Sequence, residues 1–209
     1  MNKSKKLGLL LVAIAALSLS GCIVRSNAEK DRETRNLAVK DFERIDISGS
    51  FDVVYEQGTD YKVVAEGSKR QLDALDVKSE GGTLSLSMKM MRLDVFRGGI
   101  KIRVSSPDLV GVTLTGNGDF EAPGHVDTDE IWVRLTGNGD IDFYDLICDH
   151  LYVDLTGNGD INVKNLVAGS TTLKLTGNGD IEVEGRTKKF DMQKMGNGDI
   201  DVSDLKIME

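Results

Sequence analysis

Proline, cysteine and aromatic residues are scarce in this 209-residue chain, which has two prolines, two cysteines and one tryptophan. The low proline count and the 23 glycines exclude a collagen-like or a proline-rich disordered chain, and the length leaves room for one domain of ordinary size. Basic residues are also outnumbered by acidic ones, 26 to 34, so the net charge is −8 at pH 7. Such a chain would repel nucleic-acid phosphates rather than release their counterions, so we expect no nucleic acid among its partners.

The N-terminus has the pattern of a secreted lipoprotein. Three lysines precede an apolar run over residues 7–19, which is too short for a settled membrane span. The run leads into Leu19-Ser20-Gly21-Cys22, which resembles a bacterial lipobox. We therefore expect residues 1–21 to be a signal peptide and Cys22 to be acylated, for example by palmitate, and to anchor the protein to a membrane. The alternative is a cysteine that lies by chance near an ordinary cleavage site.

The residue after the lipobox cysteine bears on the location. Ile23 stands where aspartate would retain an enterobacterial lipoprotein in the inner membrane. By resemblance to that sorting rule, we expect a cell-envelope protein anchored in the outer membrane.

The remaining cysteine has an apolar setting. Residues 22–36 are polar and aperiodic, so we expect a flexible tether there and a folded domain over residues 37–209. Acylation of Cys22 would leave Cys148 without an intramolecular disulfide partner. Because Cys148 follows Leu146 and Ile147, we interpret it as a buried, unreactive thiol rather than a reactive one.

A pentapeptide repeat dominates the second half of the chain. Thr-Gly-Asn-Gly-Asp occurs four times, and a fifth copy begins with methionine. The spacing of about 20 residues indicates stacked supersecondary units that bury their apolar faces against one another. The first glycines of the five copies are Gly116, Gly137, Gly157, Gly177 and Gly196.

Apolar and polar residues alternate on both sides of this glycine, which predicts two short strands per unit with one buried face. Lys194 breaks an apolar column only in the last unit, as expected where a terminal coil faces water. The position two before the glycine holds Leu114, Leu135, Leu155, Leu175 and Lys194, and the position four after it holds Phe120, Ile141, Ile161, Ile181 and Ile200.

Asn-Gly between alternating strands is also a strong hairpin signal, so an antiparallel meander is an alternative. A two-residue loop would set Leu135 opposite Asp142 and is excluded, but a three-residue loop would restore Leu135 opposite Ile141. The identity of the turns favours parallel stacking, because like residues about 4.8 Å apart form hydrogen-bonded ladders. We therefore predict an all-β fold: a single-chain parallel β-helix with coils of about 20 residues, right-handed by the usual hand of parallel crossovers.

The segment before the repeats adds further landmarks. They are Ser48-Gly49-Ser50-Phe51-Asp52-Val53, Gln57-Gly58, Gly82-Thr83-Leu84 and Ile102-Arg103-Val104 with Pro107. Together with the Gly-Asn-Gly-Asp turns, they resemble the bacterial "putative auto-transporter adhesin, head GIN domain" family over roughly residues 39–207. The resemblance implies a parallel β-helix on a cell-envelope protein and no established catalytic residues.

The first half of the chain has looser periodicity than the repeats. Lys69–Leu75 is the one segment that predicts a short helix. Gly98, Gly99 and the methionines at 88, 90 and 91 suggest a loop insertion before the regular coils.

An acidic column follows the turns. Unit charges about 4.8 Å apart repel by roughly 1 kcal/mol per neighbour in water, so something should compensate. We interpret each aspartate as accepting hydrogen bonds from the amides of its own turn. The alternative is that calcium, as a cofactor, bridges successive carboxylates. The candidate ligands are Asp119, Asp140, Asp160, Asp180 and Asp199.

A second column, five residues before the glycine, lies opposite the core. It should expose Trp132 and Tyr152 on adjacent coils, beside Arg134 and Asp154, whose opposite charges could pair. Exposed aromatic rings flanked by charged hydrogen-bonding groups are typical of a platform for a sugar or a protein partner. The alternative is a pair that only shields backbone or is covered by the N-terminal segment. The column reads Gly111, Trp132, Tyr152, Thr172 and Asp191.

No catalytic constellation is evident. His125 and His150 occupy non-equivalent positions without metal-ligand spacing, and nucleophile and phosphate-loop motifs are missing from the sequence. A repeated identical carboxylate column is also the opposite of an acid–base pair in unlike environments. We predict a non-catalytic, adhesin-like binding or scaffold module for a glycan or an envelope protein. The alternatives are an envelope-stress component that self-associates through its coil ends and, less favoured, a polysaccharide-active enzyme.

Overall fold

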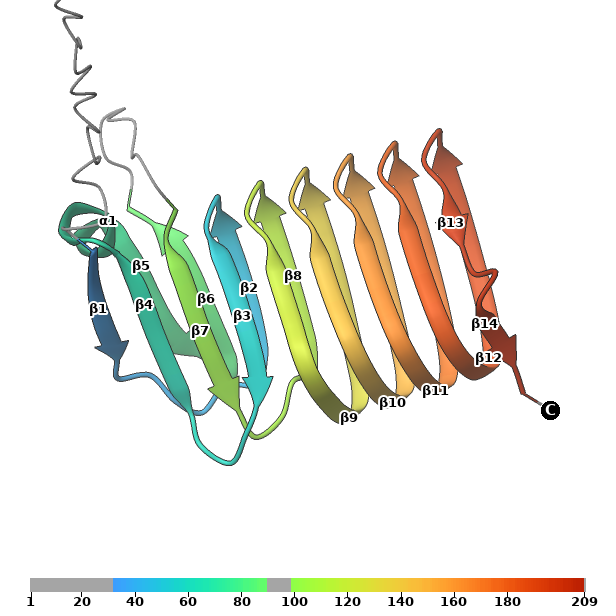
Figure 1. Cartoon of the computed structure of the whole chain (residues 1–209), viewed down its shortest axis with the longest axis horizontal. Coiled ribbons are helices and arrows are strands. Elements are labelled where there is room, and N and C mark those ends of the chain that lie inside the picture. The colour runs from blue at the N-terminus through green and yellow to red at the C-terminus, as the bar shows by residue number, and fades with distance from the viewer. Residues whose placement is uncertain (1–31, 90–98, 209) are drawn as a thin grey trace, which may run out of the picture.

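A flattened parallel β-solenoid is formed by the repeats (Figure 1). The computed structural model describes residues 32–89 and 99–208. Each repeat strand pairs in parallel with the next, and equivalent turn glycines such as Gly137 and Gly157 are direct partners. The predicted parallel β-helix with coils of about 20 residues is confirmed, and the antiparallel meander is excluded. The repeat strands are β8 (Gly111–Gly116), β9 (Phe120–Gly137), β10 (Ile141–Gly157), β11 (Ile161–Gly177) and β12 (Ile181–Gly196).

β9, β10, β11 and β12 are long bent strands, whereas β8 has six residues, so the prediction of two short strands per unit is wrong for the coils from β9 onward. β9 has 18 residues and β12 has 16, and both run from one turn to the next. The reason is that the hydrogen-bonded ladder continues around the bend, where Leu146 pairs with Val126 and Cys148 pairs with Thr128. The two arms of each coil form two layers, which we call the β3 layer and the β8 layer after one strand of each, β3 (Asp52–Gln57) and β8.

Asparagine side chains form a ladder along the turn edge of the solenoid, at the top of Figure 1. The Nδ2 of each asparagine after the first donates to the Oδ1 of the asparagine in the preceding coil, over 2.7–3.1 Å, and the first donates to Ser50 Oγ. Such a ladder requires the same residue in every coil, which explains the repeated turn sequence. Its members are Asn117, Asn138, Asn158, Asn178 and Asn197.

The coils are not stacked in the order of the sequence. β2 (Arg44–Gly49) and β3 (Asp52–Gln57) lie directly against β8 and β9, with Gly49 paired to Gly116. The next coil outward comes from later residues, in β6 (Thr83–Met88) and β7 (Lys101–Ser106), which pair in parallel with β2 and β3. The chain therefore runs to the end of the solenoid and returns past its own first coil.

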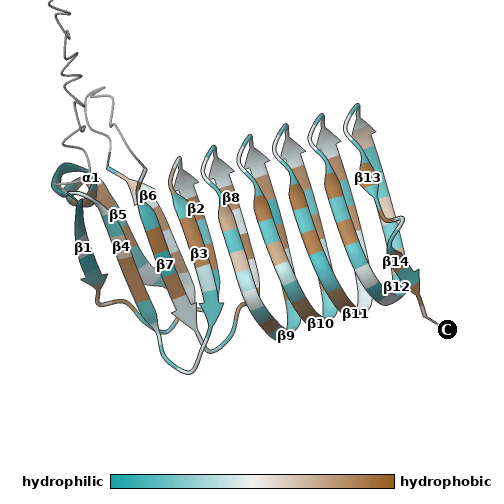
Figure 2. Ribbon diagram, viewed as in Figure 1, coloured by the Kyte–Doolittle hydropathy of each residue, from teal (hydrophilic) through white to brown (hydrophobic). Residues whose placement is uncertain are grey.

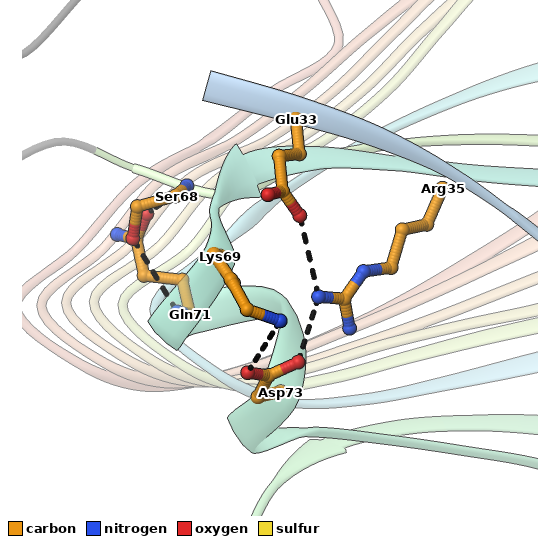
Figure 3. A network of polar contacts seen from close by, with 6 residues as sticks. All are labelled: Glu33, Arg35, Ser68, Lys69, Gln71 and Asp73. Carbon is orange, nitrogen blue, oxygen red and sulfur yellow. Dashed lines mark hydrogen bonds and ion pairs between the residues drawn. The ribbon is translucent and has the colours of Figure 1, made fainter. Parts of the chain in front are cut away.

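A cap closes the N-terminal end. It contains β1 (Arg32–Leu37), β4 (Lys62–Ser68), α1 (Lys69–Ala74) and β5 (Leu75–Glu80), and all three strands pair antiparallel. The predicted short helix is confirmed, and a capping box begins it: Gln71 N donates to Ser68 Oγ, and Ser68 N donates to Gln71 Oε1 (Figure 3).

The tether prediction is wrong at its C-terminal end, since residues 32–36 belong to the strand β1. β1 is an edge strand with charged residues on both faces, so it lacks the alternation that predicts a strand. Ion pairs hold it in place: Arg35 contacts Asp73 at 2.7 Å, and Arg32 contacts Glu66 at 3.1 Å (Figure 3 shows the former). Cys22, the signal peptide and most of the predicted loop insertion lie outside the described residues.

One apolar core extends through the described coils, and apolar and polar residues alternate along the strands that enclose it (Figure 2). Leu155 and Ile161 are fully buried, as the columns predicted. In the last coil Lys194 is exposed, also as predicted, and Met192 is 51% exposed. Beyond β12 only β13 (Ile200–Asp201) and β14 (Leu205–Ile207) follow, and they cover its first half.

Candidate functional site

Trp132 and Tyr152 lie side by side on the outside of the β8 layer, on adjacent coils. Their ring centroids are 4.1 Å apart and their planes differ by 11°, so the rings stack face to face. Trp132 is 47% exposed, whereas Tyr152 is half-buried. The indole Nε1 donates to Glu130 Oε1 at 2.7 Å, which fixes the edge of the ring and leaves its faces for other contacts.

Charged side chains of both signs flank the stack. The Oδ2 of Asp154 lies 4.0 Å from Arg134 Nε and 3.7 Å from Lys174 Nζ, so the pairing across coils is as expected. Its Oδ1 is shielded from solvent and accepts no hydrogen bond from any described residue. The face therefore offers several donors and acceptors but little uncompensated charge.

The structure adds one residue that sequence reasoning missed. Arg44 on β2 pairs with Gly111 on β8, and Gly111 pairs with Trp132. Arg44 therefore continues the aromatic column, two strands away from Trp132. The signal in the sequence was the turn glycine Gly49, which aligns with Gly116 and so places β2 in the same register. The term aromatic face refers below to Arg44, Gly111, Trp132, Arg134, Tyr152 and Asp154.

The acidic column lies beside the turns, at the start of each strand in the β3 layer. We expected each carboxylate to accept from the amides of its own turn, but among the described residues only the last aspartate, Asp199, does so. Instead, the Oδ1 of each of the first four aspartates accepts from the backbone N–H of the equivalent aspartate in the next coil, over 2.6–3.1 Å. The reason is the parallel register, which brings each amide directly over the preceding carboxylate.

Asp199 ends this column and has no following aspartate. Its carboxylate accepts from Lys194 Nζ at 3.0 Å and from the N–H of Ile200 in its own turn. These hydrogen bonds, that of Lys194 first, lower the pKa of Asp199. Lys194 thus compensates the last carboxylate from a position that is buried in the other coils.

Among the residues that the structure describes, no three His, Cys, Asp or Glu side chains converge as metal ligands. The aspartates of the column are compensated by protein donors in the way just described. Calcium binding by Asp119, Asp140, Asp160, Asp180 and Asp199 stays a prediction of the sequence.

Cys148 and the two histidines are separate features. Cys148 is 5% exposed and free, and burial raises its pKa to about 12. The thiolate is the reactive form of cysteine, so the interpretation as a buried, unreactive thiol is supported. His125 Nδ1 lies 3.0 Å from Asp145 Oδ2, whereas His150 Nδ1 lies 2.8 Å from Ser170 Oγ, and both pairs are exposed.

Comparison with known families accounts for this architecture. The family described as "Putative auto-transporter adhesin, head GIN domain" matches residues 41–167 and, in a second alignment, 144–209. The chain belongs to this family. The two matches overlap within the repeats, as expected where one coil can align with another. The GIN family is one of adhesins, which are envelope-associated proteins, and no curated protein matches the chain significantly.

Solved structures share the fold. A "putative lipid binding protein" from Parabacteroides distasonis has a TM-score of 0.74 at 22% identity, over 85% of this chain and 76% of that one. A "putative adhesin" from the same organism has a TM-score of 0.76 at 21% identity, over 83% and 74%. A "putative adhesin" from Bacteroides fragilis has a TM-score of 0.64 at 24% identity, over 83% and 97%. Within the described residues of our GIN protein, no helix is long and apolar enough to span a membrane.

Proposed function

We propose that this GIN-domain protein is a lipid-anchored, non-catalytic binding module of the cell envelope, and that it recognises its partner through the aromatic face. The observation that carries this proposal is the Trp132–Tyr152 stack, in which the larger ring is 47% exposed. A stacked pair of rings beside hydrogen-bonding groups presents a flat apolar surface with a polar rim, which suits recognition of a partner. Membership in a family described as adhesins supports a binding role.

The proposed lipid anchor is compatible with recognition through the aromatic face. The lipobox supports acylation at Cys22. We expect this lipid to anchor the protein in the outer membrane of the cell envelope. In the described sheet the aromatic face begins on β2, which β6 separates from the cap strand β5, and it extends away from the cap through β8, β9 and β10 (Figure 1). A partner outside the membrane could therefore reach the face while the lipid holds the N-terminal end.

Site-specific photocrosslinking in the native envelope tests this proposal. A photoreactive residue at Thr136, exposed on the β8 layer next to the aromatic face, should give a discrete adduct. The matched control is Glu182, which is exposed on the β3 layer two residues after Asp180 of the acidic column and should give none. Adducts from Glu182 alone, or from neither position, would contradict the proposal.

Self-association is a second candidate function, and one observation favours it. In the described structure, β13 and β14 cover the first half of β12, but no strand pairs with the outer edge of residues 189–196. Met192 and Met195 are 51% and 59% exposed there. An open edge with apolar side chains is a template for adding a strand. If self-association is the function, a photoreactive residue at Gln193 should crosslink two copies of the chain, whereas the residue at Thr136 should give no adduct with another protein.

A further inference from the structure

The aromatic column is interrupted on one side of the ring stack. Gly111 occupies the position between Arg44 and Trp132, and Tyr152 follows Trp132 on the other side. Because the two rings are nearly parallel, one face of the indole lies on Tyr152 and the other is turned toward the β8 strand. No side chain stands on β8 at this point, since the residue there is glycine.

The missing side chain leaves room for one flat ring only when the stem of Arg44 moves aside, because Gly111 is buried and the Arg44 Cγ lies above it. Arg44 and Trp132 are two strands apart, or about 9.6 Å at the usual strand spacing of about 4.8 Å. A ring stacked between two groups needs about 3.5–4 Å on each side for close contact. Among the described residues, no further ring or cation stacks on this face of the indole. The name Gly111 notch refers to the gap formed by Arg44, Gly111 and Trp132.

Arg44 covers the notch with its stem, and an exposed ion pair is the contact that its guanidinium makes among the described residues. Its Cγ lies 3.4 Å from the position that a Cβ on Gly111 would take, so its stem leans over the floor of the notch. Its guanidinium contacts Glu43 Oε1 at 3.1 Å, and the side chains are 51% and 49% exposed. Solvent screens such a pair, so little holds Arg44 in place. An entering ring could displace the stem and then lie between the guanidinium and the indole.

We propose that the Gly111 notch binds one pyranose ring of an uncharged glycan, stacked on the free face of Trp132; this inference rests on the proposed function. The C–H groups of a pyranose face suit the indole π-system, and its hydroxyls suit the donors and acceptors at the rim. The charges around the notch balance, which gives a charged ligand no advantage. Three cations (Arg44, Arg134 and Lys174) face three carboxylates (Glu43, Glu130 and Asp154). A protein partner would require a larger apolar surface than one indole face.

Gly111→Thr fills the notch without breaking the fold. A Cβ at this position meets Arg44 Cγ at 3.4 Å and Trp132 O at 3.7 Å, and the backbone needs no glycine conformation. Threonine also favours β-strands. The matched control is Thr172→Ile, a β-branched change on the opposite side of Tyr152. We would measure binding of the purified full chain to an array of immobilised neutral and anionic oligosaccharides, with the melting temperature of each variant.

We expect the wild type and Thr172→Ile to bind neutral glycans, and Gly111→Thr to bind about ten-fold more weakly or worse at an unchanged melting temperature. The proposal would be overturned if Gly111→Thr bound neutral glycans as tightly as the wild type does, or if the wild type bound only anionic glycans. If no glycan binds while Thr136 crosslinks a protein, the notch is wrong and the proposed function stands. If Gly111→Thr lowers the melting temperature, the smaller substitution Gly111→Ala takes its place and must weaken glycan binding for the proposal to stand.

Discussion

Replacing Gly157 with alanine is expected to destabilise the solenoid by about 4 kcal/mol or more. Gly157 lies in a turn at φ +142°, a conformation that residues with a side chain rarely adopt. An added Cβ would also overlap the carbonyl oxygen of Gly137 in the preceding coil. The coils cannot move apart locally, because the Asn138–Asn158 hydrogen bond and the backbone ladder fix their spacing. Urea unfolding of the purified chain, followed by circular dichroism, measures the effect.

Gly124→Ala is the matched control for this variant. Gly124 lies in the bend of β9, has no atom within 4 Å of an added Cβ and does not have a positive φ. Its replacement should change the free energy of unfolding by no more than about 0.5 kcal/mol. Equal unfolding midpoints for the two variants would show that the turns do not stack as closely as described.

Leu155→Lys is expected to be similarly severe, at about 4 kcal/mol or more, because it places an ammonium group in the apolar core without a partner. Leu155 is fully buried and belongs to the apolar column two residues before the turn glycine. Leu155→Ala, which removes volume but adds no charge, should cost about 2–5 kcal/mol. The same urea titration measures both variants.

Lys194 provides the natural contrast, since it occupies the same column in the last coil. There it is exposed and contacts Asp199 at 3.0 Å. Lys194→Leu removes only this exposed ion pair, so the free energy of unfolding should change little. If Leu155→Lys were tolerated as well as Lys194→Leu, the core would not be continuous through the coils.

The repetitive part of the fold was predictable because each coil repeats the same local choices. The apolar columns that contain Leu155 and Ile161 indicate one buried face, and the identical turns indicate parallel stacking. The order of the coils was not predictable in this way. The pairing of β2 with β8 joins segments that are far apart in sequence, and no local pattern states which coil lies next to which. β1 was missed because an edge strand with two charged faces has the composition of a tether.

In the candidate site, only the positions that follow from the repeat were predictable from the sequence. Trp132 and Tyr152 were placed together because the period fixes which residues lie on adjacent coils. Arg44 was missed since its place in the column depends on the order of the coils. The hydrogen bonds of the acidic column were assigned to the wrong coil, because the sequence does not say whether a turn amide meets its own aspartate or that of the preceding coil.

The central claim is that the aromatic face is the surface through which this GIN-domain protein meets its partner. The most direct test is the yield of the Thr136 adduct in the native envelope when Trp132 is replaced by alanine. The matched control is Tyr144→Ala, because Tyr144 is 41% exposed but lies outside the aromatic face. We predict that Trp132→Ala lowers the adduct yield about ten-fold or more and that Tyr144→Ala leaves it unchanged. An adduct of equal yield in both variants would contradict the account.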